Sequence, residues 1–93
     1  YEAFEIQYIA YFKKGGDQVK FVLNDFKPEE ICKILREWTD LTQEKFGKTI
    51  QRSGRSIRML ESGESHLTVE TLLAIAKTHN IKIIAEKEVK PEK

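Results

Sequence analysis

Two segments near the N-terminus alternate apolar and polar residues with the period of two that is typical of β-strands. The apolar positions of the first segment, residues 4–12, fall on one face: Phe4, Ile6, Tyr8, Ala10 and Phe12. Residues 19–23 are rich in β-branched and aromatic side chains, and Gly15 and Gly16 between the segments can adopt the positive φ angles of a tight turn. The pattern therefore predicts an antiparallel β-hairpin.

A two-residue turn at Gly15 and Gly16 also fixes which residues lie opposite one another. On the first face the expected pairs are Phe12 with Val19, Ala10 with Phe21 and Tyr8 with Leu23. On the opposite face they are Ile9 with Val22 and Tyr11 with Lys20. An isolated hairpin is only marginally stable in water, so we expect the first, fully apolar face to pack on another part of the protein.

From Lys27 onward the apolar period changes to that of an α-helix. Pro28 suits the first helical position, and Glu29 and Glu30 are favoured at the positive end of the helix dipole. The apolar side chains then recur on one helical face: Ile31, Ile34, Leu35 and Trp38.

Three further helices are predicted, each preceded by a hydroxyl residue that can cap it: Thr42, Ser53 and Thr68. Their apolar positions are Phe46 and Ile50 in the second helix, Ile57 and Leu60 in the third, and Leu72, Leu73, Ile75 and Ala76 in the fourth. Gly63 is expected to end the third helix, and Asn80 the fourth, because both residue types favour the left-handed conformation that closes helices.

Residues 81–85 have the composition of a strand, and residues 86–93 form a charged tail that we expect to fray. The two faces of this strand are Ile81, Ile83 and Ala85 on one side and Ile84 on the other. We predict that it joins the hairpin in a three-stranded antiparallel sheet, with the face of Phe4, Tyr8 and Phe12 on the helices.

The predicted fold class is mainly α with added β. A chain of 93 residues, 40% hydrophobic and 33% charged, is typical of one globular domain rather than of a disordered segment or of two separate cores. Within this single domain we expect a hairpin extension (1–26), a core of four or so helices (27–80), and a strand with its charged tail (81–93).

Cysteine and membrane signals point to the interior of the cell. The single Cys32 cannot form an internal disulfide, and with only His66 and His79 it cannot supply a structural zinc site. The first twelve residues lack the basic start and continuous apolar run of a secretory signal, and no stretch is long and apolar enough to span a membrane. We therefore expect a cytoplasmic protein without a metal; its start at Tyr1 suggests a processed or trimmed N-terminus.

The overall charge and the local charge differ. Sixteen Lys and Arg against 15 Asp and Glu give a net charge of +1, which by itself argues against a strongly basic nucleic-acid binder. Residues 43–59, however, carry five cations and a single acid, Glu44, a local net charge of +4. The opposing charge lies elsewhere in the chain, so this segment favours DNA as a partner.

The segment from Leu41 to Gly63 reads LTQEKFGKTIQRSGRSIRMLESG, two short helices joined by a turn that must be tight. It strongly resembles the helix-turn-helix of the Cro and lambda-repressor superfamily, often called the Xre family, and the resemblance covers roughly residues 29–81. The matching positions are the opening Leu41, Thr42, Gln43 and Glu44, the small Gly47, and then Ile57, Leu60, Glu61 and Gly63. The resemblance implies a lambda-repressor-like helical bundle that binds double-stranded DNA.

Three residues depart from the family pattern. Gln51 stands where the family usually has Gly in the turn, and a left-handed Gln costs about 1 kcal/mol, so we expect a reshaped or strained turn. Arg52 occupies a position that is usually apolar. Gly54 lies just inside the recognition helix, where relatives often present a side chain to the bases.

In the docking mode that the resemblance implies, the N-terminal residues of the recognition helix meet base edges in the major groove. Arg55 is the strongest candidate for base reading, because its planar fork can bond O6 and N7 of guanine. The other base-reading candidates are Ser56, Met59 and Gln43, and the phosphate candidates are Arg52, Ser53, Arg58, Lys48 and His66. The alternative for these residues is structural: a solvated basic face, a capping Gln43, a loop His66 and a partly buried Met59.

The second face of the predicted sheet is more apolar than exposure to solvent requires. Its residues, a candidate dimer or partner interface, are Ile9, Tyr11, Val22 and Ile84. A sheet that only extends the core is the alternative. A homodimer would present two recognition helices to successive major grooves about 34 Å apart, as the family commonly does at inverted repeats.

We therefore expect a sequence-specific transcriptional regulator, most simply a repressor that occupies an operator. The main alternative is an antitoxin that represses its own operon and holds a toxin protein with the hairpin or the tail. An enzyme is not expected, because the sequence has neither a phosphate-binding glycine loop nor a nucleophile elbow. No cofactor and no small-molecule substrate is implied.

Overall fold

A computed structural model describes residues 3–90, and the side chains of residues 5–87. In chain order the elements are β1 (Ala3–Lys14), β2 (Asp17–Val22), the short 3-10 turn η1 (Leu23–Asp25), α1 (Pro28–Thr39), α2 (Gln43–Thr49), α3 (Gly54–Ser62), α4 (Val69–His79) and β3 (Lys82–Lys90). The predicted class, mainly α with added β, is confirmed.

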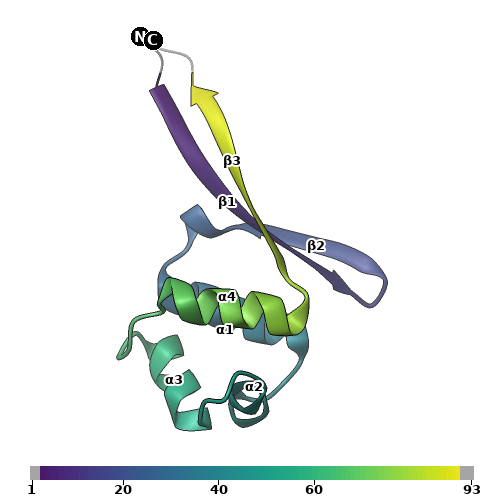
Figure 1. Cartoon of the computed structure of the whole chain (residues 1–93), viewed down its shortest axis with the longest axis vertical. Helices are drawn as coiled ribbons and strands as arrows, with labels where there is room; N and C mark the ends of the chain where they lie inside the picture. Colours follow the sequence, from purple (N-terminus) through teal and green to yellow (C-terminus); the bar gives the residue numbers. More distant parts are fainter. Residues whose placement is uncertain (1–2, 91–93) are drawn as a thin grey trace.

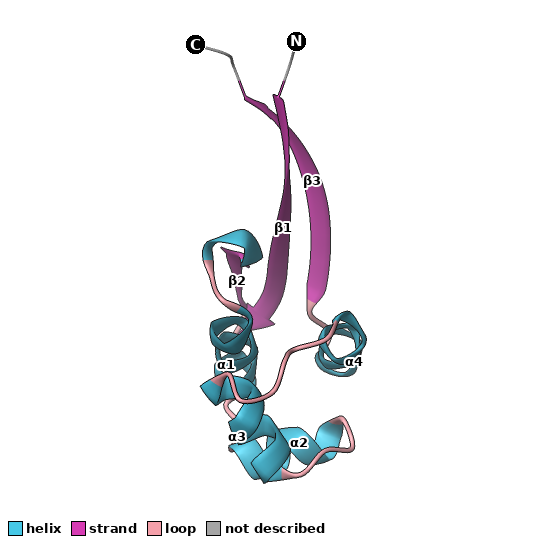
Figure 2. Cartoon of the chain, turned by 90° about the vertical axis from the view of Figure 1, so that its left-hand side faces the viewer, coloured by secondary structure: helices cyan, strands magenta, loops and turns pink. Residues whose placement is uncertain are grey.

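The elements are stacked in three levels (Figure 1). The sheet, with strand order β2-β1-β3, lies over α1 and α4, and α2 and α3 lie on the far side of those two helices. The outer half of the β1–β3 pair continues away from the helices as a two-stranded ribbon (Figure 2). The α2–α3 unit and the ribbon therefore occupy opposite ends of the molecule.

The predicted hairpin register is confirmed along most of its length. Four expected pairs are present, namely Phe12–Val19, Ala10–Phe21, Ile9–Val22 and Tyr11–Lys20. The expected pair of Tyr8 with Leu23 is wrong, because β2 ends at Val22 and the chain turns into η1. Asn24 replaces the missing strand: its side-chain Oδ1 accepts from the Tyr8 N–H (2.8 Å), and its Nδ2 donates to the Ile6 carbonyl (2.8 Å).

The C-terminal strand is longer than predicted. Antiparallel pairing with β1 extends from Tyr11–Lys82 to Ala3–Lys90, so the expected fraying of the tail is wrong for residues 86–90. A charged strand is stable here because a long partner strand satisfies its backbone groups. The remaining tail, residues 91–93, lies outside the described residues, as does Tyr1 at the other end of the chain.

The first hairpin face packs on the helices only in its inner half. Ala10 is fully buried, and the Phe12 ring stacks on Trp38 of α1 with 5.7 Å between ring centroids. Tyr8 is 46% exposed, so the close packing on the helices that was predicted for it is not present: Tyr8 lines an open groove between the sheet and α4. The side chain of Phe4 lies outside the described residues.

The predicted helix ends are confirmed. The side-chain oxygens of Thr42, Ser53 and Thr68 accept hydrogen bonds from the backbone N–H three residues later, and Gly63 and Asn80 close their helices in the left-handed conformation. The largest fully buried side chains form a core between the helices: Phe46, Leu35, Ile57, Ile75 and Cys32. Burial and the nearby Glu61 raise the pKa of Cys32 to about 11, so the thiol stays protonated. None of the described helices has the length and apolar character needed to cross a membrane.

Candidate nucleic-acid interface

The turn between α2 and α3 is closed by backbone contacts. The Arg52 N–H donates to the Gly47 carbonyl at 2.8 Å, and the Ile50 N–H donates to the same oxygen at 3.0 Å. Gln51 has φ of 59°, in the left-handed region, and the strained alternative predicted for this position is therefore confirmed. The strain is concentrated in one exposed residue, and α3 begins three residues later, at Gly54.

Two glycines allow α2 and α3 to approach closely. A Cβ atom at Gly47 would lie 2.5 Å from the Arg52 carbonyl oxygen, and a Cβ atom at Gly54 would lie 3.0 Å from the Cα atom of Glu44. Both distances are shorter than carbon contacts tolerate. Gly54 is thus explained by packing: the first turn of α3 lies directly against α2.

A partly buried polar network fixes α1, α2 and α3 to one another. Glu61 of α3 is paired with Arg36 of α1, with 2.6 Å between Oε2 and Nε, and its other oxygen accepts from Nη2 at 3.1 Å. The same oxygen, Oε1, accepts from Nε2 of Gln43 at 3.1 Å, and Arg36 also donates to the Leu41 carbonyl. The bond to Glu61 raises the pKa of Arg36. Gln43 is therefore anchored at the first turn of α2.

Arg52 connects α3 to α4. Its Nη2 donates to Oγ1 of the buried Thr71 at 2.7 Å, and its Nη1 donates to Oγ of Ser56 at 3.1 Å. Thr68 also donates to the Thr71 hydroxyl, at 3.0 Å. The sequence did not predict this link, because Thr71 lies 19 residues from Arg52 in the chain. The only signal was the unusual Arg at a position that is usually apolar.

α3 carries three of the four predicted base readers, Arg55, Ser56 and Met59, together with the phosphate candidate Arg58. Arg55 and Arg58 are exposed, whereas Ser56 and Met59 are half-buried. Ser53 caps the helix by accepting from the Ser56 N–H at 3.0 Å. The remaining N–H groups of the first turn leave a positive dipole end beside Arg55, which suits a phosphate or a base edge.

The sequence model of the Helix-turn-helix family (HTH_3) matches residues 33–84, more than half of the chain. The chain belongs to this Xre/Cro-like helix-turn-helix family. It is thus a DNA-binding transcription regulator, of a kind that is generally non-enzymatic. No curated protein and no solved structure matches the chain.

The other predicted contacts lie around the helix-turn-helix. Lys48 at the end of α2 is exposed and pairs loosely with Glu44, at 3.8 Å between Nζ and Oε1. His66 is exposed in the loop between α3 and α4. Arg52, Ser53 and Arg55 thus lie around the start of α3. Lys48 lies before them on α2, and His66 lies after α3 in the loop to α4.

One residue that the sequence did not single out supports the helix-turn-helix from α4. The ring of His79 stacks on Phe46 of α2, with 5.1 Å between centroids, and its Nε2 lies 2.8 Å from the Thr49 hydroxyl. Burial lowers the pKa of His79, which favours the neutral ring. The sequence carried no signal of these contacts, because His79 lies 30 residues from Thr49 in the chain.

Three of the predicted interface residues, Val22, Ile9 and Ile84, lie in one row across the three strands, and the fourth, Tyr11, lies next to Ile9 on the same face. Ile9 lies between Val22 and Ile84 on the outer face, and Tyr11 follows with Lys20 6.0 Å above its ring. Ile9 is only 8% exposed, and Val22 and Ile84 are half-buried, so the row offers little exposed apolar surface. Larger apolar exposure lies on the helix side, where Val69 is 71% and Leu73 57% exposed.

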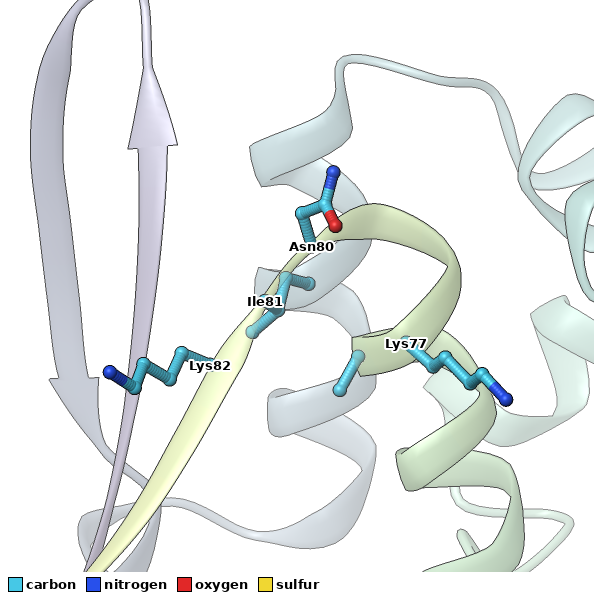
Figure 3. Close-up of a pocket in the computed structure, with 5 residues that line it drawn as sticks. Lys77, Asn80, Ile81 and Lys82 are labelled. Carbon is cyan, nitrogen blue, oxygen red and sulfur yellow. The ribbon is translucent and has the colours of Figure 1, made fainter.

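Two hollows border α4. A groove of about 510 Å³ between α4 and the sheet is lined by Tyr8, Leu23, Val69, Leu72, Leu73 and Ile83. At the end of α4, a hollow of about 400 Å³ is lined by Ala76, Lys77, Asn80, Ile81 and Lys82. Figure 3 shows that Lys77 and Lys82 extend in opposite directions, so their ammonium groups do not converge on one ligand position.

Proposed function

We propose that the protein is a repressor that binds a specific double-stranded DNA operator and acts by occupying it. The observation that carries this proposal is the exposed Arg55 at the start of α3, on a helix whose position is fixed by Glu61 and by the Arg52 link to α4. A rigid helix with one exposed guanidinium can distinguish bases, because bidentate bonding to guanine demands a defined geometry.

The other side chains take positioning roles in this proposal. Ser53, Arg58, Lys48 and His66 lie around α3 and would contact phosphates, and phosphate contacts set the register of a protein on the duplex. Ser56 and Met59 would face the groove beside Arg55. Gln43 has one amide N–H bonded to Glu61, which leaves its second N–H to donate to a phosphate or a base, and its carbonyl oxygen to accept from a base.

Arg52 would combine two roles. Its two terminal nitrogens already bond Thr71 and Ser56, and each still has an N–H that could reach a phosphate oxygen. A homodimer would place two such units on an inverted repeat, with half-sites about one helical turn apart.

The test begins with selection of bound duplexes from a random library, which supplies the operator. Arg55→Ala should then weaken binding to this operator by about 1 to 3 kcal/mol, roughly fivefold to 150-fold, and leave binding to random duplexes nearly unchanged. Arg58→Ala is the matched control on the same helix: it should weaken both kinds of binding alike. Equal loss on both duplexes for Arg55→Ala would remove that residue from base reading, and selection of no sequence at all would contradict the proposed function.

A further inference from the structure

β3 is an outer strand of the described sheet. The hydrogen bonds of β1 show which backbone groups of β3 point away from the sheet. The Tyr8 N–H and the Ile6 carbonyl point toward the β2 side, where Asn24 bonds both. Alternate residues point to alternate sides, so the odd-numbered residues of β1 bond to β3. Their partners Lys82, Ile84 and Glu86 thus use their backbone groups inside the sheet, while those of Ile83 and Ala85 face outward.

The other side of the sheet offers far less backbone for pairing. β2 has six residues against nine in β3, and its outward-facing positions include the exposed Gln18 and Lys20. Beyond the end of β2, the amide of Asn24 occupies the edge of β1. Short strands are a common device against edge pairing, so the longer β3 is the edge better suited to accept another strand.

The sequence of β3 is complementary to itself in one antiparallel register. Pairing centred on Ile84 sets Ile84 opposite its own copy, Ile83 opposite Ala85, and Lys82 opposite Glu86 on both sides. A centre at Ala85 would instead oppose Ile84 with Glu86, and a centre at Ile83 would oppose Ile84 with Lys82. Apolar pairs and opposite charges stabilise cross-strand neighbours, which selects the first register.

This register also matches the direction of the backbone groups. It pairs Ile83 with Ala85, the two residues whose N–H and carbonyl groups face outward, so each can bond its opposite residue. Ile84 then forms a pair without mutual backbone bonds, the arrangement in which opposed side chains lie closest. Charge, apolar character and hydrogen bonding therefore agree on a second copy of this chain as the occupant.

We propose that two copies dimerise by antiparallel pairing of their β3 edges about Ile84, forming one six-stranded sheet. The two-fold axis then stands perpendicular to the sheet, so the helical layers of both copies lie on the same side of it. The α2–α3 units lie beyond those layers and so face in one direction (Figure 1). Packing the outer faces around Ile9 would point the two α3 helices in opposite directions, away from a common duplex.

The pairing also changes the groove beside α4. Ile83 lines this groove and lies on the same sheet face as Ala85, which in the dimer would be its neighbour from the other copy. The partner's strand would thus adjoin the exposed apolar side of α4, where Val69 and Leu73 lie. The dimer proposal rests on the proposed function in one point only: the requirement that both α3 helices face the same DNA duplex.

The first test is the mass of the purified chain without DNA, by sedimentation equilibrium over a range of concentrations. The unchanged protein should have twice the mass of one chain. Ala85→Pro removes an outward N–H and leaves the β1–β3 ladder intact, so it should give a monomer with an unchanged helical circular dichroism spectrum. Gln18→Pro is the matched control, a proline at an outward position of the opposite edge, and should remain dimeric.

The second test addresses the register. Lys82→Glu and Glu86→Lys each place like charges opposite one another, and each should raise the dimer dissociation constant about tenfold. The double variant restores opposite charges and should dimerise like the unchanged chain. Neither residue opposes a charge on β1, where the neighbours are Tyr11 and Gln7, so the fold of one chain is unaffected.

Three outcomes would overturn the proposal: a monomeric unchanged chain, a dimeric Ala85→Pro variant, or a double variant no better than its parents. The dimer proposal would also be overturned if the chain by itself were monomeric and Ala85→Pro abolished its binding to a different, co-purified protein. None of these outcomes touches operator binding, which the duplex selection tests separately. A monomer that selects a single half-site would leave the proposed function standing and remove the dimer.

Discussion

At the scale of single residues, three non-glycine residues among the described part of the chain adopt positive φ: Asp40, Gln51 and Asn80. Asn and Asp tolerate this conformation because their short side chains bond locally, whereas Gln has no such compensation. Gln51 is also exposed, so no packing offsets its strain. The turn of the helix-turn-helix therefore stores a conformational cost in one side chain.

Gln51→Gly should raise the free energy of unfolding by up to about 1 kcal/mol, because Gly removes the left-handed strain while adding some freedom to the unfolded chain. Urea titration followed by circular dichroism measures the change. Gln51→Ala keeps the strain and should leave the stability nearly unaltered. A gain with Ala equal to that with Gly would show that the Gln side chain, and not the backbone, is unfavourable.

Caps and stops were predictable from sequence because each depends on residues within one turn. Thr42, Ser53 and Thr68 bond the backbone three residues later, and Asn80 ends its helix through its own conformation. The role of Arg52 was not predictable, because Thr71 comes from another helix. The site was thus foreseen as a set of residue types, while the contacts that hold those residues in place needed the fold.

At the scale of secondary-structure elements, Glu61 holds three helices in place. The Glu61 side chain is 7% exposed, and its carboxylate binds both Arg36 and Gln43. Glu61→Ala should lower the free energy of unfolding by about 3 kcal/mol, because it leaves a partly buried guanidinium without its partner. Thermal and urea unfolding give the value, and Glu64→Ala, at an exposed acid in the next loop, should change it by less than about 0.5 kcal/mol.

A second variant separates the cost of an orphaned charge from the value of the pair. Arg36→Met combined with Glu61→Leu removes both charges and should be less destabilising than Glu61→Ala alone. A double variant as unstable as the single one would mean that the ion pair itself contributes most of the stability.

Among the strands, the sequence predicted the hairpin turn and register because the glycines and the apolar alternation agree. It did not predict the outer half of β3, where Glu86 and Lys87 interrupt the apolar pattern. The outer half of β3 pairs because β1 is long enough to extend beside it, which cannot be predicted from residues 86–90 alone. Likewise, Tyr8 has the pattern of a buried residue, but it lines an open groove beside α4 and stays 46% exposed.

At the scale of the whole molecule, the net charge of +1 and the local charge of the helix-turn-helix predict how binding depends on salt. The proposed phosphate contacts include three permanent cations per copy, Arg52, Arg58 and Lys48. A dimer that neutralises six phosphates should give a slope of log K against log salt of about −5, whereas one chain gives about −3. Titration of the operator at several salt concentrations measures it, and a slope near zero would contradict phosphate binding by these residues.

The side chain of Asn24 has a further consequence for the assembly. By bonding Tyr8 and Ile6, it fills the place where a third strand could otherwise extend β1. A sheet that can grow at both margins forms open fibres, whereas one that can grow at a single margin stops at two copies. In the proposed dimer, Asn24 would therefore stop further strand addition at β1, so that assembly ends at a closed pair and not at a polymer.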